Sequence, residues 1–156
     1  MIGFIPMAGN DIGANWFIRS LCDDAAERLT GREVEIRWQS PYSDRLGRHV
    51  NGAAYRLGNK GVIELEPDRP LEAVYKTFLH ECAHLARDWH MFADLARPGP
   101  APAEKATNAV NQVHAGMETR AERLAGRWDA WATGRNDSSI GARLLELSSC
   151  WPGGDG

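Results

Sequence analysis

The pentapeptide His80-Glu81-Cys82-Ala83-His84 contains the residue types that chemistry at a metal ion requires. On an α-helix, residues four apart project from the same face, with Cβ atoms about 5–6 Å apart. His80 and His84 could therefore bind one zinc ion. Glu81 could take the proton from a water molecule that this ion activates. We predict a Zn²⁺ cofactor at this motif, with Glu81 as the general base.

A catalytic zinc site needs a third protein ligand, and two positions compete for this role. Glu118 lies 34 residues after His84 and is followed one helical turn later by Glu122, whose carboxylate could accept a hydrogen bond from a ligating histidine. His90 is the alternative, but no glycine lies between His84 and His90 to turn the chain. On a continuing helix His90 would be rotated about 240° away from His84. Glu118 is the predicted ligand, and Glu122 and His90 stay open as alternatives.

Zinc hydrolases also use a hydrogen-bond donor for the oxyanion that develops during the reaction. His114 is four residues before Glu118 and would share its helical face, so we assign it to catalysis. Tyr55 and Tyr75 are alternative donors. A capping or surface role for His114 also fits its position.

The elements that must position these residues follow from hydrophobic periodicity and turn residues. The pattern predicts helices over residues 15–29, 71–95, 103–133 and 138–147, and strands over residues 33–38, 53–57 and 61–66. Together they describe one α+β domain over residues 1–150, followed by a flexible tail at 151–156. We expect a small, mostly antiparallel three-stranded sheet that packs on the motif-bearing helix and on the glutamate-bearing helix.

The segment from about residue 53 to 128 resembles the gluzincin peptidases. It has a strand-turn-strand unit, then His80-Glu81-x-x-His84, then Glu118-x-x-x-Glu122 on a second helix. Within the gluzincins it is most similar to the ImmA/IrrE-like peptidases and the minigluzincins. The resemblance implies a zinc endopeptidase with Glu118 as third ligand and the last strand lining the cleft. Glu122, where the related pattern often has Asp or Asn, and the proline-rich insertion at 97–102 depart from it.

The strand at 61–66 immediately precedes the motif-bearing helix, and its apolar residues alternate imperfectly. Both features are compatible with an edge strand. An edge strand offers unpaired backbone groups to which an extended peptide can bind. We therefore predict that Val62, Ile63 and Glu64 bind substrate, although a central position for this strand stays open.

Composition and charge narrow the classes of function. The net charge is -3, so the chain lacks the basic surface that nucleic-acid binding requires. No segment approaches the roughly 20 apolar residues of a membrane span. The three cysteines are widely spaced, which favours a reducing compartment, and we expect a cytoplasmic protein. The predicted partner is a peptide or protein substrate, and the oligomeric state is not predicted.

Three functions agree with these features. A zinc-dependent endopeptidase is favoured because a purely structural site has no use for Glu81. A regulatory or protein-binding module with a vestigial zinc site is the alternative from another class. A zinc hydrolase that acts on a non-peptide amide is the third.

Overall fold

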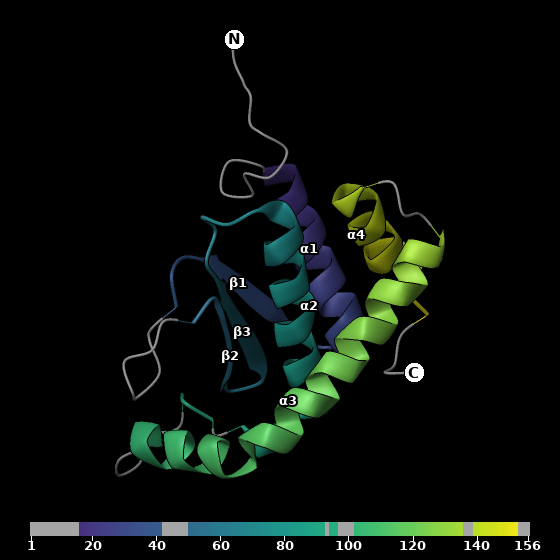
Figure 1. The fold of residues 1–156 in the computed structure, drawn as a ribbon. Helices are drawn as coiled ribbons and strands as arrows, with labels where there is room; N and C mark the ends of the chain where they lie inside the picture. The colour runs from purple at the N-terminus through teal and green to yellow at the C-terminus, as the bar shows by residue number, and fades with distance from the viewer. Residues whose placement is uncertain (1–15, 42–49, 93, 97–101, 136–138, 153–156) are drawn as a thin grey trace.

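The computed structural model describes residues 16–41, 50–92, 94–96, 102–135 and 139–152, and of residues 102–115 it describes the backbone only. Figure 1 shows the arrangement of the elements. In chain order they are α1 (Trp16–Thr30), β1 (Val34–Trp38), β2 (Gly52–Leu57), β3 (Lys60–Leu65), α2 (Leu71–Arg87), the short 3₁₀ helix η1 (Trp89–Met91), α3 (Pro102–Arg135) and α4 (Ile140–Ser149). The predicted α+β class and the order of the elements are confirmed.

The sheet has the strand order β1-β3-β2, with β3 parallel to β1 and antiparallel to β2. The sheet is therefore mixed, and the prediction of a mostly antiparallel sheet needs this correction. The prediction that β3 is an edge strand is wrong, because both of its edges are paired. Val62, Ile63 and Glu64 pair with β1 on one edge and β2 on the other, so they offer no open edge to which a peptide could add. Their side chains are also buried. Consecutive apolar residues are typical of a strand covered on both faces.

One face of the sheet packs against α1 and α2. Two glycines allow α2 to come close. A Cβ atom at Gly52 would lie 2.4 Å from Thr77 Cγ2, and one at Gly61 would lie 2.7 Å from Leu85 Cδ1. The other face carries a polar network in which Tyr55 donates a hydrogen bond of 2.8 Å to Glu64, which explains how this glutamate is buried.

The motif-bearing helix α2 ends at Arg87, eight residues earlier than predicted. Asp88 leaves helical geometry with φ -111° and ψ 16°, and η1 follows. Trp89 is buried, and the guanidinium groups of Arg32 and Arg56 lie 4.1 and 4.8 Å from its ring centroid. These cation–π contacts and the burial of the indole favour a turn of the chain at this point, although no glycine or proline marks it.

Helices α3 and α4 complete the core, and α3 packs along α2. Trp151 was expected in the flexible tail, but it is buried, and its ring centroid lies 6.5 Å from that of Trp128 and 5.1 Å from that of Trp131. Its carbonyl oxygen accepts a hydrogen bond of 2.6 Å from Arg28 Nε. Trp151 therefore belongs to the folded core, and residues 153–156 lie outside the described part.

The burial of Trp151 gives a test of this boundary. We expect Trp151→Ala to lower the free energy of unfolding by about 3–5 kcal/mol, because the substitution leaves a cavity between two other tryptophans. Leu145→Ala, at a side chain of α4 that is 51% exposed, is the matched control and should change it by about 1 kcal/mol or less. Urea unfolding measures both, and equal values would place Trp151 outside the core.

Candidate metal centre

Three side chains from two helices converge at the end of the sheet. His80 and His84 project from α2, and their Nε2 atoms lie 3.1 Å apart. Glu118 projects from α3, with Oε1 2.8 Å from His84 Nε2 and Oε2 2.9 Å from His80 Nε2. One ligand atom from each residue can be chosen such that all lie within 4.8 Å of one another. Within the described side chains, these three residues form a group that could hold a metal ion.

The separations between these atoms fit a tetrahedral divalent ion. Metal–ligand distances of about 2.0–2.1 Å place the ligand atoms of a tetrahedral site roughly 3.3 Å apart. The observed 2.8–3.1 Å is close to this value, so outward movements of a few tenths of an ångström make room for an ion. Two imidazole nitrogens and one carboxylate also form a donor set that catalytic zinc sites use.

The second nitrogen of each histidine ring faces another carboxylate. His84 Nδ1 lies 3.2 Å from Asp88 Oδ2, and His80 Nδ1 lies 2.5 Å from Glu122 Oε1. A proton held on Nδ1 leaves the Nε2 lone pair free for a metal ion. The Glu122 contact does not have the geometry of an in-line hydrogen bond, and it is an ion pair when His80 is protonated. The Asp88 side chain is 1% exposed and the Glu122 side chain is 72% exposed. A buried carboxylate therefore contacts the His84 ring, and an exposed one contacts the His80 ring.

Sequence reasoning missed Asp88. It lies four residues after His84, as His84 lies four residues after His80, and this spacing alone indicates a shared helical face. Arg120 Nη2, two residues beyond Glu118 on α3, lies 3.3 Å from Asp88 Oδ1. Asp88 therefore contacts both a candidate ligand and the helix that carries another.

Opposing effects set the pKa values of these residues. Burial lowers the pKa of His80, but the hydrogen bond to Glu118 and the nearby charges of Glu81 and Glu122 outweigh it and raise this pKa to about 9. Burial also lowers the pKa of His84, but its hydrogen bond to Glu118 and the nearby charge of Glu81 outweigh burial and raise this pKa. Hydrogen bonds from both histidines hold the pKa of Glu118 well below its usual range. In the metal-free chain at neutral pH, a proton on His80 therefore offsets part of the charge of these carboxylates.

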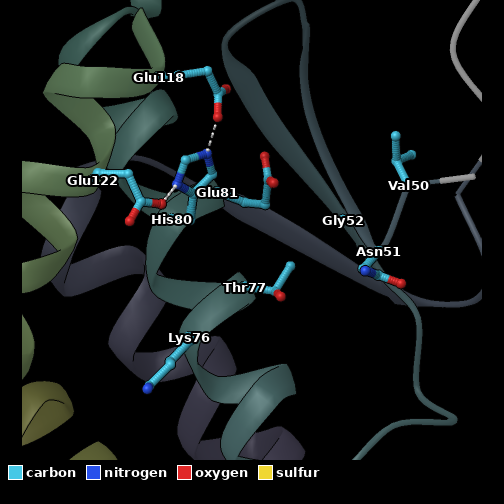
Figure 2. A pocket seen from close by; sticks show the side chains of 9 residues that line it. All are labelled: Val50, Asn51, Gly52, Lys76, Thr77, His80, Glu81, Glu118 and Glu122. Carbon is cyan, nitrogen blue, oxygen red and sulfur yellow. Dashed lines mark ion pairs between the residues drawn. The ribbon is translucent and has the colours of Figure 1, made fainter. Parts of the chain in front are cut away.

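A pocket of about 370 Å³ opens beside this group. Figure 2 shows α2 along its floor, with Glu118 and Glu122 on one side and the start of β2 on the other. Its lining residues are Val50, Asn51, Gly52, Lys76, Thr77, His80, Glu81, Glu118 and Glu122. Burial raises the pKa of Glu81 above its usual range, so its carboxylate is a stronger base than an exposed one.

The remaining predicted residues lie elsewhere. His90 is exposed in η1 and does not belong to the His80–His84–Glu118 group. The Tyr75 hydroxyl is buried against Asp129 at 2.9 Å, and Tyr55 contacts Glu64, so neither tyrosine lines the pocket. His114 lies in α3, in the stretch whose side chains are outside the described part.

Comparisons of the chain with protein-family models, with curated proteins and with solved structures gave no match. In the described residues, no helix is long and apolar enough to cross a membrane. The geometry of this site is therefore the feature of the chain that points to a function.

The raised pKa of His80 predicts that metal binding releases a proton. At pH 7, below the pKa of about 9, His80 is protonated in the metal-free chain, whereas a ligand must be neutral. Zinc affinity should therefore rise with pH up to about 9 and then level off. Calorimetry at pH 7, in two buffers of different ionisation enthalpy, should give a release of about one proton or more. Identical enthalpies in both buffers would contradict this.

The contact between Asp88 and His84 predicts a second effect. We expect Asp88→Asn to weaken zinc binding by about 10- to 100-fold, because the His84 ring loses the carboxylate that orients it. Competition with a chromophoric chelator measures the affinity, and a melting curve checks the fold. Asp24→Asn, at an exposed position of α1, is the control. A folded Asp88→Asn variant with parental affinity would exclude an orienting role.

Proposed function

We propose that this chain is a zinc-dependent endopeptidase of the gluzincin type. His80, His84 and Glu118 hold the ion, and Glu81 is the general base. The observation that carries the proposal is the convergence of three ligand atoms from α2 and α3 beside a pocket that Glu81 also lines. Bound zinc would supply a Lewis acid for the scissile carbonyl and a water that ionises near neutral pH.

Glu81 takes the proton from the attacking water and delivers it to the leaving amine. A base does both when its pKa lies close to the working pH, and burial moves the pKa of Glu81 in that direction. Glu81 lines the pocket rather than the metal group itself. This position suits a reacting group, and a vestigial or structural site would not require it.

The substrate is a peptide in extended conformation, bound along the outer edge of β2 instead of β3. Arg56 on this edge already pairs with residues 94–96, so the peptide adds at Gly52 and Ala54. The carbonyl oxygen of Asn51 accepts a backbone hydrogen bond from Glu66 of the neighbouring chain segment. In the antiparallel pairing of β2 with β3, every second residue of β2 forms such hydrogen bonds. Gly52 and Ala54 therefore direct their backbone N–H and C=O groups away from β3. Gly52 also lines the pocket, so a strand added at this edge passes beside Glu81. Backbone pairing of this kind favours a peptide over another amide.

Glu81→Gln tests the role of the base. Gln is nearly isosteric and cannot accept a proton, so we expect cleavage of an unstructured protein such as casein to fall by about 10²- to 10⁴-fold. Zinc content and melting temperature should stay at the parental values. Removal of zinc by a chelator should abolish cleavage in the parent, and added zinc should restore it. Equal turnover by parent and variant would contradict the assignment of Glu81.

A further inference from the structure

We propose that the end of the pocket farthest along α2 from the metal group is a carboxylate-binding subsite formed by Lys76 and supported by Arg69. It would select peptides that carry a carboxylate on the C-terminal side of the scissile bond. This carboxylate is an acidic side chain or the terminal carboxylate of the peptide. The inference rests on the proposed peptidase function.

Lys76 lies one helical turn before His80 on α2 and lines the same pocket (Figure 2). Among the described residues that line this pocket, it is the one lysine or arginine. Its side chain is 67% exposed, so the ammonium group is accessible to a bound peptide. The carboxylates of the pocket, on Glu81, Glu118 and Glu122, lie farther along α2, toward the metal group (Figure 2). Positive charge is therefore at one end of the pocket and negative charge toward the other.

A second cation contacts the same wall of the pocket. Arg69 Nη1 lies 3.4 Å from Thr77 Oγ1, and Thr77 lines the pocket beside Lys76. The Thr77 hydroxyl donates its own hydrogen to the carbonyl oxygen of Ala73 at 3.0 Å, so it accepts from Arg69. This contact places a guanidinium group next to the proposed subsite.

The acidic neighbour of Lys76 binds it weakly. Glu72 Oε1 lies 4.0 Å from Lys76 Nζ, at the limit of an ion pair, and both side chains are more than half exposed. The other oxygen of Glu72 lies 3.7 Å from Arg143. Exposed ion pairs of this kind contribute little stabilisation. Lys76 can therefore exchange Glu72 for a carboxylate of the substrate.

The direction of β2 determines which part of a peptide reaches Lys76. Gly52 lies against Thr77 and Glu81, whereas Gly61, the partner of Arg56, lies against Leu85. Strand β2 therefore runs in the same direction as α2. An added strand pairs better in the antiparallel sense, so the peptide runs from the Leu85 end of α2 toward Thr77. Residues after the scissile bond then pass Lys76.

The distance along α2 between Lys76 and His80 indicates which substrate residue would contact Lys76. Four residues of α-helix separate Lys76 from His80, which is a rise of about 6 Å. An extended peptide covers this distance in about two residues. The selected carboxylate should therefore belong to the first or second residue after the scissile bond.

A peptide library tests the subsite. N-acetylated random decapeptides are prepared with a free terminal carboxylate and, separately, with a terminal amide, and they are incubated with the zinc-loaded chain. Mass spectrometry of the products gives the residues around each cleaved bond. We expect a three- to fivefold enrichment of a carboxylate within two residues after that bond, as for an exposed ion pair. Salt should reduce the enrichment.

Substitutions assign the enrichment to Lys76. Lys76→Gln should remove it, and Lys76→Glu should replace it with a preference for Lys and Arg. Arg123→Gln removes one charge from an exposed position of α3 that does not line the pocket, and it should behave as the parent. Enrichment near the chain end that is lost on amidation identifies the terminal carboxylate. Enrichment that survives amidation identifies Asp and Glu side chains.

Several outcomes would overturn the subsite. These are parental preferences in Lys76→Glu, enrichment on the N-terminal side of the bond, or Glu81-dependent cleavage without any charge preference. In each case the peptidase function would stand. No cleavage by the folded, zinc-loaded parent would overturn the subsite and the proposed function together.

Discussion

The contact of one carboxylate with two imidazoles depends on the close packing of α2 and α3. Glu118 reaches His80 and His84 at 2.9 and 2.8 Å only because the two helices lie close together along this stretch. Ala83 of α2 and Ala121 of α3 are fully buried, and their small side chains suit a close approach of the helices. The ion pair between Arg120 and Asp88 joins the same two helices one turn away. The geometry of the candidate ligands therefore depends on how these two helices pack.

This constraint concentrates negative charge in a partly buried region. Glu81, Glu118 and Asp88 lie beside two histidines, and burial of unpaired carboxylates is costly. In the metal-free chain, a proton on His80, whose pKa is raised to about 9, supplies compensating charge, and the pKa of His84 is raised as well. A divalent ion would supply the same compensation while the ligands become neutral. The electrostatics of the site thus couple metal binding to proton release.

The local sequence pattern was sufficient to predict the site residues whose relative positions follow from helix geometry. The spacing of His80 and His84 and the Glu118/Glu122 pair could be read from the sequence, as could the order of the elements. The central position of β3 could not, because it depends on pairing with β1, a contact between segments distant in sequence. The end of α2 at Arg87 and the burial of Trp151 depend on tertiary contacts that no glycine or proline signals.

The two histidines differ in their burial and in their access to the pocket. His84 is buried, and its ring is held by a carboxylate that is itself buried, whereas His80 contacts an exposed one. His80 lines the pocket with Glu81 and Glu122, and His84 does not. The His84 side of the site therefore belongs to the core and fixes the geometry of the ligands. The His80 side faces the pocket, so a ligand that entered the pocket would meet this histidine and Glu81 first.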